Sequence, residues 1–119
     1  MKLLLLSLSG AMGMMIALVH GYLGETQVIG PTTTRTDAHR RVLQAIMFLS
    51  AVYWFVAGFV LLLSPRYLTG TTQTVVICAM AAILASGSVA NFWATRGKHF
   101  GWVLLAIACG IALAGAWLP

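Results

Sequence analysis

The sequence predicts an all-α integral membrane protein whose single domain, residues 1–119, is a four-helix bundle. Hydrophobic residues make up 61% of the chain and charged residues 8%, and the mean hydropathy is +0.95. Ordinary soluble proteins are about 25% charged and under about 50% apolar. A soluble domain this small could not bury so much apolar surface, so the bilayer is the expected solvent. Any chemistry must then use helix faces or short loops.

The first apolar run covers residues 3–23 and would reach about 30 Å as a helix, enough to cross the hydrocarbon core. A start of Met1-Lys2 followed by leucines also resembles a signal peptide. The run is longer than a usual signal core of about 7–15 residues, and residues 17–21 do not fit a small-x-small cleavage site. We therefore expect this segment to be a retained membrane helix.

Three further apolar runs follow, each bounded by polar or turn-forming residues. Thr36 or Asp37 is expected to cap the start of the second helix, and Ser64-Pro65-Arg66 is expected to end it. Gly30-Pro31 predicts a turn in the preceding polar segment. The remaining helices are expected over residues 37–63, 73–93 and 100–118.

Basic residues gather in two loops that four spans would place on the same side of the membrane. Loops 24–40 and 94–99 hold Arg35, Arg40, Arg41, Arg96 and Lys98, whereas the other side holds Lys2 and Arg66. The positive-inside rule then predicts cytoplasmic loops and both termini outside, and the small size suggests a bacterial inner membrane. The net charge of +5 comes without a basic patch interleaved with aromatic residues, so nucleic acid is not an expected partner.

Small residues recur every four positions on three of the expected helices, a spacing that lets membrane helices approach closely. The second helix is bulkier and offers Gly58. Trp54 lies near the middle of that helix, where its indole N–H needs a partner, and a buried packing role is expected. The predicted packing residues are Gly13, Ala17, Gly21, Ala82, Ser86, Gly110 and Ala114.

All three histidines and both acids lie at or near one membrane face. Imidazole and carboxylate are common ligands for zinc and related metals, and histidine relays protons near neutral pH. His20, Glu25 and His99 are therefore the candidate metal ligands, although no cofactor is predicted. The alternative is that these residues, with Asp37 and His39, are solvated loop groups and helix caps. Haem held by His20 and His99 is a further alternative.

The motifs of common catalytic sites are missing from the sequence. It has no P-loop, no dinucleotide fingerprint and no GxSxG context, so we expect no enzymatic activity. The leading interpretation is an accessory or scaffold subunit that packs against a larger membrane protein complex, or against copies of itself. The alternatives are a metal- or haem-binding or proton-handling protein and, third, a small oligomeric transporter. The transporter is disfavoured because no charged residue lies deep in a span.

Two short motifs resemble a family of small bacterial four-helix membrane proteins of unknown function. Residues 20–25, His-Gly-Tyr-Leu-Gly-Glu, are similar to the family's His-x-x-Leu-Gly-Glu pattern, and residues 98–102, Lys-His-Phe-Gly-Trp, to its basic-His-x-Gly-Trp pattern. The family's aromatic-His pair early in the second helix is replaced by Met47-Phe48. The resemblance implies the architecture but no activity. Because both motifs share a face, we expect His20 or Glu25 to bond the turn before the fourth helix.

Overall fold

A computed structural model describes residues 1–31 and 36–118; Arg35, counted above among the basic loop residues, lies outside them. The described residues form helices and turns without a strand, which confirms the all-α bundle. Its elements are α1 (Lys2–Leu23), the π-helical segment η1 (Gly24–Ile29), α2 (Asp37–Tyr67), α3 (Gly70–Thr95) and α4 (Gly101–Trp117).

Three helical segments are long and apolar enough to cross a membrane: α1 with η1, α2 and α3. The fourth, α4, is apolar but has only 17 residues. A helix of that length reaches about 25 Å, short of a hydrocarbon core of about 30 Å. The predicted fourth helix over residues 100–118 corresponds to α4 and differs from it by one residue at each end. The chain is a helical bundle of membrane type.

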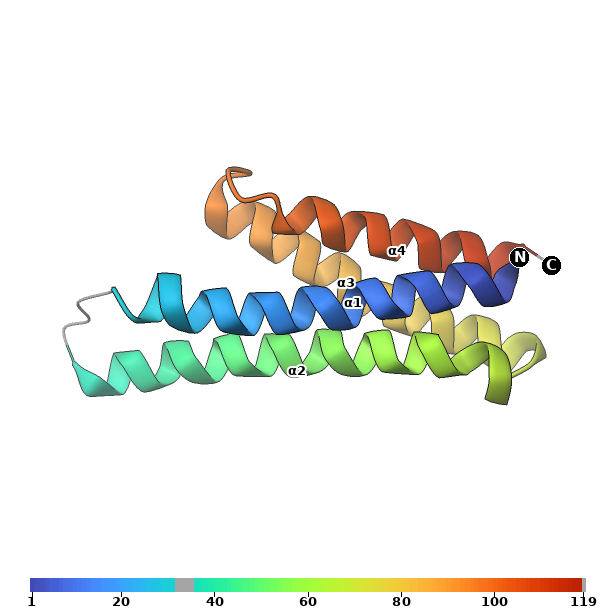
Figure 1. The fold of residues 1–119 in the computed structure, drawn as a ribbon, viewed down its shortest axis with the longest axis horizontal. Helices are drawn as coiled ribbons and strands as arrows, with labels where there is room; N and C mark the ends of the chain where they lie inside the picture. Colours follow the sequence, from blue (N-terminus) through green and yellow to red (C-terminus); the bar gives the residue numbers. More distant parts are fainter. Residues whose placement is uncertain (32–35, 119) are drawn as a thin grey trace.

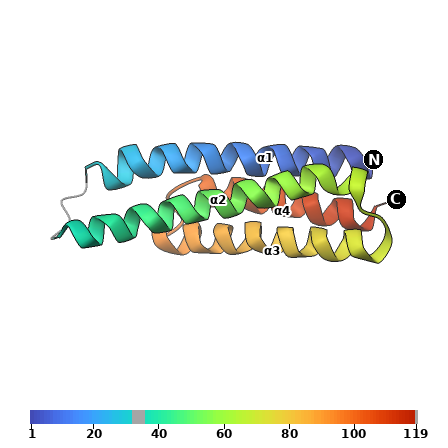
Figure 2. The same cartoon turned by 90° about the horizontal axis from the view of Figure 1, so that it is seen from below.

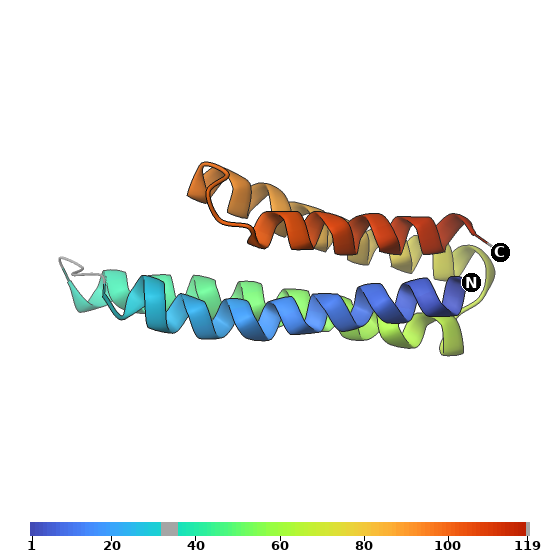
Figure 3. The same cartoon turned by 45° about the horizontal axis from the view of Figure 1, so that its top comes forward.

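The helices form two antiparallel hairpins, α1–α2 and α3–α4, with both chain termini at one end of the bundle (Figure 1). Helix α1 packs on α2 and α4, while α3 packs on α4 and, least extensively, on α2. The α1–α2 hairpin extends beyond the α3–α4 turn (Figure 2). The two hairpins lie closest near the termini and diverge toward their turns (Figure 3). The side between α2 and α3 is thus the most open.

The tightest approach in the bundle joins α1 to α2 at two glycines. A Cβ added to Gly58 would lie 2.6 Å from the Gly10 carbonyl oxygen and 2.8 Å from the Met14 nitrogen. A Cβ added to Gly10 would lie 2.7 Å from the Leu62 nitrogen. Real Cβ atoms do not approach backbone atoms so closely, so this crossing needs glycine on both helices.

Helix α2 continues through Pro65 to Tyr67, beyond the predicted end at residue 63. Proline has no N–H, so it leaves the carbonyl of Leu61 without its usual helical donor. The Ser64 hydroxyl donates to that carbonyl oxygen at 3.0 Å. The helix therefore loses no buried hydrogen bond at the proline, which explains why Ser64-Pro65-Arg66 does not end it.

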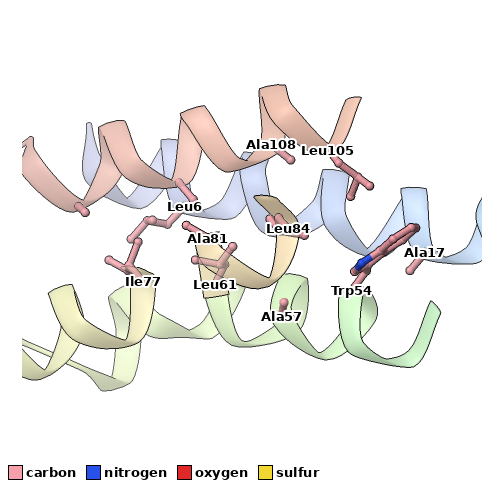
Figure 4. Close-up of a cluster of buried hydrophobic side chains, with 12 residues drawn as sticks. Leu6, Ala17, Trp54, Ala57, Leu61, Ile77, Ala81, Leu84, Leu105 and Ala108 are labelled. Atoms are coloured by element: carbon pink, nitrogen blue, oxygen red, sulfur yellow. The ribbon is translucent and has the colours of Figure 1, made fainter. Parts of the chain in front are cut away.

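The small residues predicted to pack between helices are buried or half-buried on α1, but those predicted on α3 and α4 are exposed. Gly13 and Ala17 are buried and Gly21 is half-buried against Ala51. The core instead uses the neighbouring face of the other two helices (Figure 4). Both helices carry small residues on several faces, so spacing alone could not select the inner one. The residues predicted to pack there but exposed in the structure are Ala82, Ser86, Gly110 and Ala114.

Helix α4 is tied to α1 by one buried hydrogen bond, from the Ser9 hydroxyl to the Ala108 carbonyl oxygen at 2.7 Å. Interhelical hydrogen bonds of this kind contribute about 0.6 kcal/mol on average and up to about 1.7 kcal/mol in membrane proteins. We expect Ser9→Ala to lower the free energy of unfolding by about 1 kcal/mol in a detergent denaturation assay. Ser7→Ala, two residues away, is the control and should change it little. Equal losses in both variants would contradict this role for Ser9.

Candidate functional site

His20 of α1 lies against the middle of α2, between Ser50 and Trp54. Its Nε2 is 3.1 Å from the Ser50 hydroxyl oxygen, and its ring centroid is 4.4 Å from that of Trp54. The Ser50 hydroxyl in turn donates to the Met47 carbonyl oxygen at 2.9 Å. A hydroxyl that donates to Met47 can still accept, and it does so from a His20 that carries its proton on Nε2. His20 therefore serves as a helix-to-helix tie between α1 and α2.

Trp54 is the large aromatic residue of the core, with 5% of its surface exposed. Its ring lies against Gly87 of α3, where an added Cβ would come within 2.6 Å of the indole Cε2. In Figure 4 the Trp54 side chain points from α2 into the cluster, beside Ala17 of α1. The buried role predicted from the sequence agrees with this position, and Gly87 is what makes room for the ring.

A groove of about 490 Å³ opens between α2 and α3 at this tryptophan. Small side chains of α3 form one wall, and aromatic side chains of α2 form the other. The lining residues are Ser50, Tyr53, Trp54, Ile83, Ser86, Gly87 and Ala90. We call this hollow the α2–α3 groove.

The indole N–H of Trp54 has no hydrogen-bond acceptor among the described residues. Every fully buried side-chain nitrogen and oxygen in the described part of the chain does have a partner. The unpaired indole nitrogen is therefore not fully buried, and Trp54 is one of the residues that line the groove. The α2–α3 groove thus has mostly small residues on its α3 wall, while its α2 wall carries the unpaired indole N–H of Trp54 beside the hydroxyl groups of Ser50 and Tyr53.

The residues predicted as metal ligands do not form a cluster. Glu25 accepts a hydrogen bond from Gln44 of α2 at 3.2 Å. The His99 Nδ1 accepts from the Gly101 backbone N–H at 3.1 Å, within its own turn. His20 faces Ser50, as described above. In residues 1–31 and 36–118, no three histidine, cysteine or acidic side chains could together hold a metal ion.

Asp37 and His39, the other two candidates at this membrane face, lie in the first turn of α2. The Thr36 hydroxyl oxygen accepts from the His39 backbone N–H at 3.4 Å, which confirms Thr36 as the N-cap of α2. It also lies 2.7 Å from the His39 Nδ1. Asp37 occupies the first turn of the helix, where a negative charge is favourable. These positions fit the alternative of caps and solvated loop groups.

The hydrogen bond expected from His20 or Glu25 to the turn before α4 is not present, because both side chains bond to α2. Glu25→Ala and His99→Ala should therefore change the free energy of unfolding independently. In a double-mutant cycle we expect an interaction energy below about 0.5 kcal/mol. As a positive control, Glu25→Ala combined with Gln44→Ala should show measurable coupling. Strong coupling between Glu25 and His99 would contradict the structure.

Sequence reasoning missed the α2–α3 groove. It identified Trp54 as unusual because of its depth, but not Ser50 or Gly87 as its neighbours. The sequence feature that could have indicated the groove is a large aromatic residue on one span, Trp54, and a glycine at similar depth on another, Gly87. Which helices pack together could not be known from that signal alone.

The fold and the α2–α3 groove define a helical membrane bundle with a lateral hollow. No family model matches the sequence, and no curated protein or solved structure matches it significantly. The resemblance of the two short motifs stays a prediction.

Proposed function

We propose that this protein is an accessory subunit of a larger membrane protein complex and that its α2–α3 groove receives a membrane helix of the partner. It would reside in a bacterial inner membrane with both termini outside and the basic turns in the cytoplasm. In this role the chain contributes packing surface and no chemistry of its own.

One observation carries the proposal: the free indole N–H of Trp54 in the α2–α3 groove. Trp54 lies near the middle of an apolar span, where acyl chains offer no hydrogen-bond acceptor. A second membrane helix can bring a hydroxyl, amide or carbonyl oxygen to that depth. Ser86, Gly87 and Ala90 on the opposite wall leave room for close helix packing. A protein helix therefore suits the groove better than lipid alone.

The other two functions find less support in the geometry. A metal, haem or proton-handling role needs His20, Glu25 and His99 to act together, and each has a separate partner. A small transporter needs a polar path, whereas the α2–α3 groove offers mainly apolar and small side chains. A visible spectrum, metal analysis and a transport assay would address these roles directly.

The proposal is tested by extracting the tagged chain gently with its native lipid and identifying by mass spectrometry what co-purifies. We expect one membrane protein at fixed stoichiometry with the native chain, and much less of it with Trp54→Phe, which keeps a ring but removes the N–H donor. Trp117→Phe, at an exposed position near the C-terminus, is the matched control and should retain the partner. Recovery of the chain alone, or of its own copies only, would overturn the proposal.

A further inference from the structure

The turn between α3 and α4 holds an arginine in a backbone conformation that favours glycine. Arg96 follows α3 with φ 51° and ψ 38°, in the left-handed region, and Gly97 after it has φ 73°. Helices commonly end with a glycine in this conformation, because a Cβ there costs about 1 kcal/mol or more. Among the described residues Arg96 alone has a positive φ without being glycine.

The turn around Arg96 is well anchored without help from the arginine side chain. The Gly97 N–H donates to the Phe92 carbonyl oxygen at 2.8 Å, and the Trp102 indole N–H donates to the Gly97 carbonyl oxygen at 3.3 Å. Phe92 and Trp102 also pack edge to face, with centroids 5.1 Å apart. Backbone bonds and aromatic packing thus fix the turn. The guanidinium of Arg96 makes no hydrogen bond or ion pair with another described residue.

A shallow hollow of about 510 Å³ lies beside this turn, lined by Phe92, Trp93, Ala94 and Arg96. Trp93 is 82% exposed there. Exposed tryptophan at the end of a membrane helix is typical of the headgroup level. Lys98, also exposed, adds a second positive charge to the same turn. The hollow therefore joins an aromatic surface, suited to acyl chains and glycerol, to the unpaired guanidinium of Arg96, with Lys98 exposed two residues further along the same turn.

We propose that this turn is a binding site for the phosphate of an anionic phospholipid, with the Arg96 guanidinium as its main ligand and Lys98 as a second cation. Trp93 and Phe92 would contact the upper part of the acyl chains. A guanidinium offers a planar pair of donors that matches phosphate oxygens. The strained backbone at Arg96 is then explained by the need for its side chain at this point.

The charge distribution over the whole bundle supports an anionic ligand at this end. Trp54 and Gly87 touch, and so mark one depth on α2 and α3. From there, Arg41 lies roughly 20 Å along α2 and Arg96 roughly 14 Å along α3, at 1.5 Å per residue. The two levels differ by roughly 6 Å, about the thickness of one headgroup layer. Arg40, Arg41, Arg96 and Lys98 therefore lie toward the same end of the bundle, which also holds the acids Glu25 and Asp37, so basic residues outnumber acidic ones there by four to two among the described residues.

The test measures lipid retention by native mass spectrometry of the purified chain in a neutral detergent. Phosphatidylglycerol and phosphatidylcholine with the same acyl chains are added in separate titrations. We expect preferential retention of phosphatidylglycerol, with Arg96→Gly weakening it roughly fivefold, the effect of about one lost cation–headgroup contact. Inorganic phosphate at the same concentration should not displace the lipid. Because glycine suits this backbone, the melting temperature of Arg96→Gly should be unchanged or higher.

Arg66→Gln, which removes one positive charge at the opposite end of the bundle, is the matched control and should retain phosphatidylglycerol like the native chain. Equal loss of lipid in the two variants would overturn the site, because it would show an effect of net charge alone. Equal retention of both lipids, or displacement by inorganic phosphate, would overturn it as well. So would a lower melting temperature of Arg96→Gly, since the arginine would then support the fold.

Discussion

Replacing Gly58 by alanine is expected to lower the free energy of unfolding by about 3 kcal/mol, at the upper end of the cost of overpacking. The new methyl group would lie 2.6 Å from the Gly10 carbonyl oxygen and 2.8 Å from the Met14 nitrogen, both backbone atoms. Neither can move aside without separating α1 from α2 along their whole contact. The change is measured by unfolding the purified protein in mixed detergent micelles and following its helical signal.

Gly110→Ala is the matched control, because a Cβ added at Gly110 meets nothing within 4 Å. Its free energy of unfolding should be unchanged or raised by less than about 1 kcal/mol through helix propensity. If Gly58→Ala proves as stable as Gly110→Ala, the close crossing of α1 and α2 is incorrect.

Trp54→Ala is expected to cost about 2–3 kcal/mol of unfolding free energy. Truncating a buried aromatic residue in a soluble core costs about 3–5 kcal/mol. The cost should be smaller here because an unfolded helix in lipid already has an apolar environment, so only packing is lost. That loss covers the contacts of the ring with His20 and Gly87. The same detergent unfolding assay measures it.

Trp117→Ala serves as the control for Trp54→Ala, since Trp117 is 77% exposed. We expect less than about 0.5 kcal/mol for this exposed substitution. Equal losses of unfolding free energy at the two positions would mean that the Trp54 ring is not packed in the core between α2 and its neighbouring helices.

Sequence reasoning was most successful where hydrophobic length decided the answer. The positions of the helices follow from apolar runs, and the N-cap at Thr36 from its hydroxyl before the acidic first turn of α2. The sequence-based prediction that α2 ends before Pro65 was wrong. The Ser64 hydroxyl replaces the missing proline N–H as donor to the Leu61 carbonyl, and this bond depends on a side-chain rotamer that the sequence does not reveal. Sequence reasoning also missed η1, where the helix continues past Leu23 into a segment that reads as polar loop.

The candidate site was harder to predict because it depends on which helices are neighbours. Any four-span topology places His20, Glu25 and His99 at one membrane face. In the structure each side chain instead forms a hydrogen bond with a different neighbouring residue. Ala82 and Ser86 lie on a small-residue face of α3, but the inner face uses Ile77, Ala81 and Leu84. Spacing of four residues marks a face of a helix; it does not say whether that face turns inward or toward a partner.

The central claim, that the α2–α3 groove receives a partner helix, is tested most directly by photo-crosslinking in the native membrane. A photoreactive amino acid at Ser86 would sit in the groove. The same group at Val89, one turn along α3 and 68% exposed, is the control for exposure to lipid at similar depth. We predict a single protein adduct from Ser86 that is absent from Val89 and much reduced by Trp54→Phe. Only lipid adducts from Ser86, or the same protein adducts from both positions, would contradict the account.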